Sequence, residues 1–98
     1  MAIFLHLQND RMAMPSQIHI TVLYFAGAKD ATGKRRESIK LPEDTTIREL
    51  LLVISSTHPR IRNILNSMQI AVNYKVVGVD AILKEADEVA LLPPVSGG

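Results

Sequence analysis

The sequence predicts an α+β fold of two layers, in which a mixed sheet of four to five strands packs on one main helix and a short second helix. Three observations support this prediction. Two strand-like segments come first, a capping box then marks the start of a helix, and three more strand-like segments come after it. Strands on both sides of one amphipathic helix indicate a single sheet that covers the apolar face of that helix.

The first predicted strand covers residues 18–25, which are rich in β-branched and aromatic side chains. Alternate residues form one apolar face, and Leu23 and Phe25 make the other face apolar too. The C-terminal half of this strand is therefore expected to be covered on both sides. A loop is expected over residues 26–36, because an Ala-Gly pair interrupts the pattern. A second, half-exposed strand is expected over residues 37–41 and stops at a proline.

The main helix is predicted to begin at Thr46, because Thr46 and Glu49 have the spacing of a capping box. Apolar residues then recur from Ile47 at i, i+3, i+4 and i+7, which places them in one stripe along the helix. Pro59 ends this helix, since proline restricts the residue before it and lacks a backbone donor. A shorter apolar stripe over residues 61–68 predicts one or two helical turns beside the main helix.

Three strand-like segments complete the chain, over residues 70–74, 76–80 and 88–92. A polar turn over residues 84–87 separates the last two. The predicted order is thus two strands, the main helix, the short helix and three strands.

At 98 residues the chain is long enough for one domain. Residues 1–17 share no period with the rest of the chain, so the prediction is a flexible N-terminal extension, with the folded domain over residues 18–98. The apolar run at the start is short and lacks a positive region, which is not typical of a targeting signal. No stretch has the ~20 apolar residues of a membrane span. The expected location is the cytosol.

Composition excludes several classes of function. With 11 basic and 10 acidic residues the net charge is +1, which favours neither nucleic acid nor an anionic membrane as a partner. The one basic run, over residues 34–36, is interpreted as a solvated turn rather than a phosphate site. The chain has no cysteine, its three histidines are far apart, and it has no Gly-rich phosphate loop. We therefore expect no metal site and no self-contained active site.

The C-terminal segment is different, because residues 89–98 carry no charged side chain. Pro93 and Pro94 favour an extended, stiff backbone. Gly97 and Gly98 have no Cβ, so another protein can approach the terminal carboxylate closely. A Gly-Gly end can also arise without function, but the stiff uncharged stem favours a tail that is handled by partner proteins.

Three segments, Ala71-Val-Asn73, Asp87-Glu-Val-Ala90 and Pro93-Pro-Val-Ser-Gly-Gly98, resemble the small subunit of molybdopterin synthase, a family of sulfur carriers of molybdenum cofactor synthesis. The resemblance spans about residues 18–98, and it implies a ubiquitin-like β-grasp fold. Leu91 and Leu92 depart from the family pattern, where an aromatic residue is common. Docking on a partner is therefore expected to differ there.

The resemblance implies that Gly98 carries the chemistry. An adenylyltransferase similar to ubiquitin-activating enzymes would use ATP to adenylate Gly98, and a sulfur donor would convert the adenylate into a thiocarboxylate. The loaded tail would then donate sulfur to cyclic pyranopterin monophosphate in the large subunit, which holds the catalytic pocket, within an expected heterotetramer. Gly97 would give steric clearance, and this chain would bind no cofactor itself. The residues expected to contact the partner are Leu92, Pro93, Pro94, Val95 and Ser96.

Further expectations concern individual side chains. Ser96 is interpreted as a spacer rather than a nucleophile, and Leu92 with aliphatic residues of the adjoining sheet is expected to form an exposed apolar docking patch. Tyr24, Phe25 and Tyr74 are assigned to the core or the sheet surface rather than to function. Three alternatives stay open: a ubiquitin-related modifier that forms isopeptide bonds, a sulfur carrier of tRNA or thiazole synthesis, and a plain β-grasp binding module.

Overall fold

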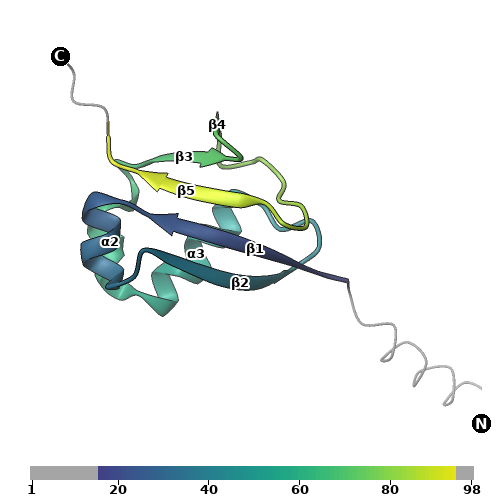
Figure 1. Ribbon diagram of the computed structural model, residues 1–98, viewed down its shortest axis with the longest axis horizontal. Coiled ribbons are helices and arrows are strands. Elements are labelled where there is room, and N and C mark those ends of the chain that lie inside the picture. The colour runs from purple at the N-terminus through teal and green to yellow at the C-terminus, as the bar shows by residue number, and fades with distance from the viewer. Residues whose placement is uncertain (1–15, 95–98) are drawn as a thin grey trace, which may run out of the picture.

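The computed structural model describes residues 16–94, which form a five-stranded mixed sheet with helices on one face (Figure 1). The strand order is β2-β1-β5-β3-β4. The elements are β1 (Gln17–Tyr24), α2 (Ala26–Thr32), β2 (Arg36–Pro42), α3 (Ile47–Thr57), the 3₁₀ helix η1 (Pro59–Ile61), α4 (Arg62–Leu65), β3 (Gln69–Val72), β4 (Lys75–Val77) and β5 (Glu88–Leu92). The predicted α+β class, mixed sheet and main helix are confirmed.

The core lies between the sheet and the helices. Because side chains alternate along a strand, each strand gives one set of residues to this core and the other set to the open face of the sheet. In β1 the buried set alternates with exposed or half-buried residues, and α3 contributes its predicted apolar stripe. The largest fully buried side chains are Tyr24, Ile20, Ile47, Leu50, Ile54, Ile61, Leu83, Leu91, Val22 and Val89.

The capping box at the start of α3 is confirmed. The Glu49 backbone N–H donates to Thr46 Oγ1 at 3.3 Å, and the Thr46 backbone N–H donates to Glu49 Oε1 at 2.9 Å. These bonds satisfy donors that the first helical turn leaves free. At the other end, α3 stops before Pro59, as the sequence predicts, with His58 as its C-cap. The short helix predicted over residues 61–68 begins earlier and ends earlier, as η1 from Pro59 and α4 to Leu65.

The predicted loop over residues 26–36 is wrong, because Ala26–Thr32 form the helix α2. The helix ends at Gly33, which has φ 73° and donates its N–H to the Lys29 carbonyl at 2.8 Å. Gly27 packs closely on the helical layer, since a Cβ built there would lie 3.3 Å from Ile64 Cδ1. This glycine therefore allows close packing rather than breaking the chain into a loop.

The third predicted strand, residues 70–74, ends earlier than expected. β3 stops at Val72, and Asn73 and Tyr74 form the turn to β4 with φ values of 51° and 73°. Two consecutive positive φ values are typical of the tight turns that join hairpin strands. The final strand has the predicted bounds, Glu88–Leu92.

A polar cluster joins the helical layer to the edge of the sheet. Tyr24 Oη donates to Glu37 Oε1 at 2.7 Å, and His58 Nε2 lies 2.9 Å from the same oxygen. Because a carboxylate only accepts, His58 Nε2 carries the hydrogen. Burial raises the pKa of Glu37, but hydrogen bonds from Tyr24 and His58 and the nearby charges outweigh it, so the pKa falls below its ordinary value of 4.5.

We expect Glu37→Gln to lower the free energy of unfolding at pH 7 by roughly 1–3 kcal/mol, because the ionised acceptor is lost. A lowered folded-state pKa contributes stability above the unfolded value of 4.5 and loses it as pH falls through the folded pKa. The variant should therefore lose less stability than the wild type below pH 4.5. Urea unfolding across this range measures the difference. The exposed Glu43→Gln is the control, and an equal effect there would contradict the assignment.

Candidate functional site: the end of the sheet where the tail leaves

The C-terminal stem leaves the fold from the centre of the sheet. β5 is the middle strand, between β1 and β3, and it ends at half-buried Leu92. Pro93 and Pro94 come next and are both exposed. The tail residues Val95, Ser96, Gly97 and Gly98 lie outside the described residues, so their expected roles stay predictions.

Strand directions bring other segments to this same end of the sheet. β1 runs parallel to β5, so the end of β1 and the residue after it, Phe25, lie beside the end of β5. β2 is antiparallel to β1 and pairs Arg36 with Leu23. The end of β1, the start of β2 and the end of β5 therefore meet where the stem leaves (Figure 1).

An apolar depression of about 280 Å³ lies on the open face of the sheet next to this point. A cross-strand row runs through it, since Leu23 pairs with Ala90, Ala90 with Ala71, and Ala71 with Val76. We call this surface the apolar patch, and it is lined by Leu23, Phe25, Ala71, Tyr74, Val76, Glu88, Ala90 and Leu92.

The apolar patch corrects the expectation that the C-terminal half of β1 is covered on both sides. In the part of the chain that the structure describes, Leu23 is half-buried and Phe25 is 44% exposed. Exposed apolar surface of this kind is typical of interaction sites. Phe25 and Tyr74, expected in the core or on the sheet surface without a role in function, both line the patch. The apolar run on the outer face of β1 is the sequence feature that indicates it.

The motifs at residues 71–73 and 87–90 hold the hairpin that forms one border of the patch. Asn73 Nδ2 donates to Asp87 Oδ1 at 2.9 Å, and the Glu88 backbone N–H donates to Asn73 Oδ1 at 3.0 Å. Asp87 also accepts the Lys84 backbone N–H at 2.8 Å. These bonds tie the β3–β4 turn to the start of β5, so the motifs position the patch rather than perform chemistry.

Tyr74 adopts a strained backbone at the tip of this hairpin. Its φ of 73° is unfavourable for a residue with a Cβ, and its side chain is 95% exposed. We expect Tyr74→Gly to raise the free energy of unfolding by about 1 kcal/mol and the melting temperature by several degrees, because Asn-Gly suits this turn. A thermal melt tests this, with Lys75→Gly in β4 as a control that should be destabilised. A lower melting temperature for Tyr74→Gly would contradict the strain argument.

Residues 16–94 show neither a metal-binding cluster nor a membrane-spanning helix. No group of three or more His, Asp or Glu side chains there is placed to hold a metal ion. His19 bonds the exposed Glu85, and His58 belongs to the Glu37 cluster, so within this range the two are engaged separately. None of the helices in this part of the chain is long and apolar enough to cross a membrane.

Comparison with known families decides which class of protein this is. The ThiS family profile matches residues 22–98, which include the whole apolar patch and the tail to its last residue. The chain belongs to the ThiS family. This match includes the segments at 71–73, 87–90 and 93–98 that carry the resemblance.

Relatives of this ThiS-family chain carry one recurrent name. This chain is 34% identical over 82 residues to the human molybdopterin synthase sulfur carrier subunit, with 81% of this chain and 93% of that protein covered. It is 37% identical over 83 residues to the protein of the same name from Caenorhabditis elegans, with 83% and 99% covered. The resemblance to the sulfur-carrier family is thus confirmed.

Solved structures identify the fold by their similarity to this chain. A putative molybdopterin converting factor subunit 1 from Pyrococcus furiosus matches with a TM-score of 0.75 and 31% identity, over 80% of this chain and 99% of that one. Urm1 from Trypanosoma brucei matches at TM-score 0.66 and 18% identity, over 87% and 100%, which shows the shared fold alone. A chain from the complex of subunits 1 and 2 of molybdopterin-converting factor from Helicobacter pylori matches at TM-score 0.61 and 23% identity, over 83% of this chain and 100% of that one, which likewise shows the shared fold alone. The ubiquitin-like β-grasp fold is therefore confirmed.

Proposed function

We propose that this chain is the sulfur-carrier subunit of a molybdopterin synthase and that its Gly98 carboxyl carries the sulfur. The observation that supports this most directly is the family match, which extends to Gly98 at the end of a stem that leaves the central strand. The relatives named above support the pathway. The exposed Pro93 and Pro94 support a stem that partner proteins can reach.

The proposed chemistry takes place on the main chain. A free carboxylate is a poor acyl donor, so an adenylyltransferase first joins Gly98 to AMP and releases pyrophosphate from ATP. Hydrosulfide then attacks the carbonyl carbon, the new C–S bond forms, and the C–O bond to AMP breaks. The product is a thiocarboxylate, which is ionised at neutral pH and nucleophilic. The acyl carbon keeps its oxidation state throughout.

The second half of the reaction belongs to the large subunit in this proposal. The sulfur of loaded Gly98 attacks a side-chain carbon of cyclic pyranopterin monophosphate in a pocket of that subunit, and a C–O bond at that carbon breaks as the C–S bond forms. Water then hydrolyses the acyl C–S bond, which leaves the sulfur on the substrate and restores the Gly98 carboxylate. Two loaded carriers supply the two sulfurs of one dithiolene. The phosphate contacts and acid–base groups would come from the large subunit. Gly97 provides clearance, while Val95 and Ser96 act as spacers inside the partner. ATP is used by the adenylyltransferase, and this chain binds no cofactor of its own.

The assignment also implies the partners. The large subunit docks on the apolar patch and receives the tail, in a heterotetramer of two carriers and two large subunits. The adenylyltransferase binds the same tail before the large subunit does, and both binding events take place in the cytosol. Subunits 1 and 2 of the Helicobacter pylori factor were solved as a complex, which supports the first pairing for this chain.

Intact-mass measurement tests the proposed loading. Incubation of the full chain with the activating enzyme, ATP and sulfide should increase its mass by about 16 Da, the difference between oxygen and sulfur. Fragmentation should place the increase on Gly98. Transfer to the precursor should occur once the large subunit is added. Mass added to an internal side chain, or isopeptide adducts on lysines in place of sulfur transfer, would overturn the proposal in favour of another modification or of a ubiquitin-related modifier.

A further inference from the structure

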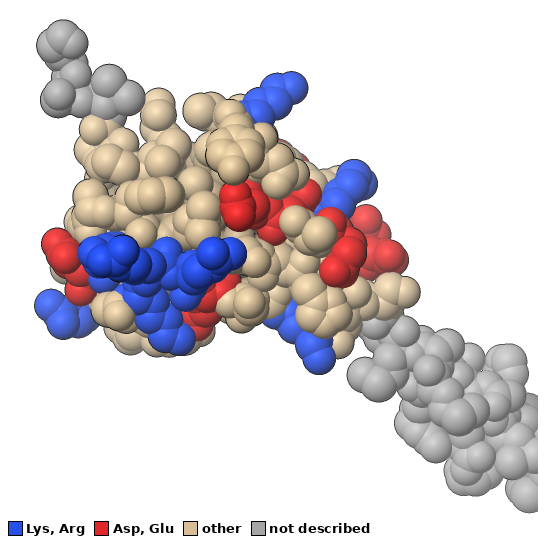
Figure 2. Space-filling model, in the orientation of Figure 1, with Lys and Arg blue, Asp and Glu red and all other residues tan. Residues whose placement is uncertain are grey.

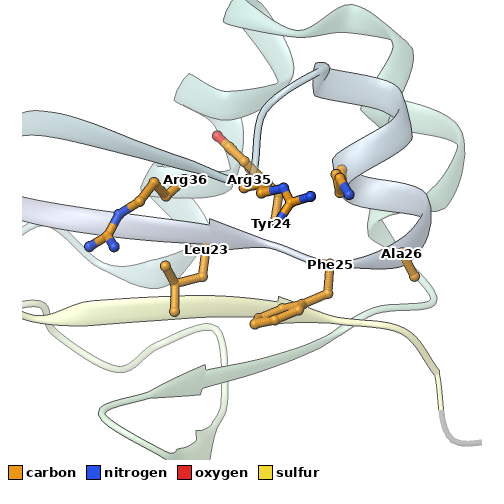
Figure 3. Close-up of a pocket in the computed structure, with 7 residues that line it drawn as sticks. Leu23, Tyr24, Phe25, Ala26, Arg35 and Arg36 are labelled. Atoms are coloured by element: carbon orange, nitrogen blue, oxygen red, sulfur yellow. The ribbon is translucent and has the colours of Figure 1, made fainter.

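A group of basic side chains adjoins the apolar patch at the end of the sheet. A depression of about 440 Å³ is lined by Lys29 of α2, Arg35, and Arg36 of β2. Leu23 and Phe25 line both this depression and the apolar patch, so the two surfaces are continuous. Figure 3 shows the side chains of Leu23 and Phe25 over β5, with Arg35 and Arg36 beside them. We call the surface formed by these three basic residues the basic depression.

The fold fixes where these charges lie. Arg36 pairs with Leu23 across the β1–β2 ladder, and the Tyr24 backbone N–H donates to the Arg35 carbonyl at 2.8 Å. Lys29 reaches the same place because α2 comes directly after β1. Residues distant in sequence from the C-terminal stem are thus held beside the point where it leaves.

These basic side chains take part in no ion pair within residues 16–94. Lys29, Arg35 and Arg36 are all exposed, and no ion pair joins any of them to an acidic side chain in that range. Lys34 differs, because it lies 3.4 Å from Glu37. Asp30 lines a separate depression, with Arg60. Figure 2 shows this group of Lys and Arg side chains, with acidic side chains at its margin, next to an uncharged area over the end of β5.

We propose that the basic depression is the charged part of the docking surface and that it receives a carboxylate-bearing segment of the large subunit. This proposal rests on the proposed function. Continuity with the apolar patch places any protein docked there against the three basic side chains. Guanidinium groups bind carboxylates through two parallel hydrogen bonds, so Arg35 and Arg36 fit an acidic segment better than a neutral one.

Other anions fit this position less well. A nucleotide joined to Gly98 would lie four residues beyond Pro94, which is up to ~13 Å from Pro94 along an extended chain. Nucleic acid requires a larger surface of one sign, whereas this chain has a net charge of only +1. An acidic segment of a docked protein does not have to be carried to this position by the tail, and it does not need a large surface of one sign.

The proposal predicts how binding depends on charge and salt. Charges at the edge of an interface mainly raise the association rate, and salt screens them. We expect the double variant Arg35→Glu/Arg36→Glu to bind the large subunit at least about tenfold more weakly at about 50 mM salt, chiefly through slower association. At about 500 mM salt the difference from the wild type should fall to about twofold or less.

The test is a kinetic binding measurement of the full chain with the purified large subunit at both salt concentrations. Lys40→Glu/Lys84→Glu is the matched control, because it changes the net charge equally near the opposite end of β1, where Lys40 pairs with His19 and Glu85 bonds His19. Arg35→Ala/Arg36→Ala removes the charges without reversing them and should show a smaller loss in the same direction. Thermal melts confirm that each variant is folded.

The possible results separate the two proposals. Equal losses of affinity for the large subunit in the Arg35/Arg36 and Lys40/Lys84 variants, or no loss in either, would overturn the proposed role of the basic depression. The proposed sulfur loading of Gly98 would be unaffected. Wild-type carrier that is loaded but does not bind the large subunit at either salt concentration would overturn both this inference and the assignment to molybdopterin synthase.

Discussion

Deletion of Gly98 is expected to abolish sulfur loading completely while leaving the fold unchanged. The family match includes this residue, and the chemistry proposed needs a carboxyl with no Cβ on the last two residues. Removing Gly98 moves the carboxyl back by one residue, ~3.5 Å along the chain, which places it out of reach of a nucleotide bound at a fixed site. Intact mass after incubation with the activating enzyme, ATP and sulfide should show no product.

Two further variants make this result specific. Adding one alanine after Gly98 should block loading as fully as the deletion. The terminal carboxyl would then lie one residue further along the chain than the Gly98 carboxyl, and the Cβ methyl group of the alanine would stand beside it. Ser96→Ala should load normally if Ser96 is a spacer. The melting temperatures of all three should match the wild type, since the core that the structure describes is formed by residues between Ile18 and Leu91. Loading of the Gly98 deletion at the wild-type rate would remove the basis of the proposed function.

The local chemistry of the chain can be predicted from its sequence. The capping box at Thr46 and Glu49, the stop at Pro59 and the bounds of β5 each depend on neighbouring residues, and the structure confirms all three. The helix α2 is not predicted because it has only one fully buried side chain, Ala28, and therefore no apolar stripe to reveal it. Packing on the helical layer and the cap at Gly33 stabilise it instead.

The composition of the docking surface depends on strand order, which local patterns do not give. Nothing near Arg35 or Arg36 in the sequence connects them with a tail that begins more than fifty residues later. They meet because β1 pairs in parallel with β5 and in antiparallel with β2. The same pairing turns the outer face of β1 into part of the apolar patch, where Phe25 and Leu23 border both surfaces. A run interpreted as a solvated turn thereby becomes a candidate recognition site.

Leu92→Asp is expected to weaken binding of the large subunit by about 100-fold or more. Leu92 lines the apolar patch and precedes the stem, so a docked partner would remove its side chain from water. An unpaired carboxylate enclosed in an apolar interface costs several kcal/mol, and central apolar contacts contribute about 2 kcal/mol or more each. Because Leu92 is half-buried at the end of β5 and outside the core, the fold should tolerate the change.

Leu52→Asp is the matched control for this experiment. Leu52 is 65% exposed on α3, in the helical layer on the other face of the sheet, so the same substitution there should leave binding within about twofold of the wild type. Leu92→Ala, which removes contact area without adding charge, should give an intermediate loss. Titration calorimetry with the full chain measures all three affinities. If Leu92→Asp binds as tightly as Leu52→Asp, the partner does not cover the patch, and the tail must enter it from another side.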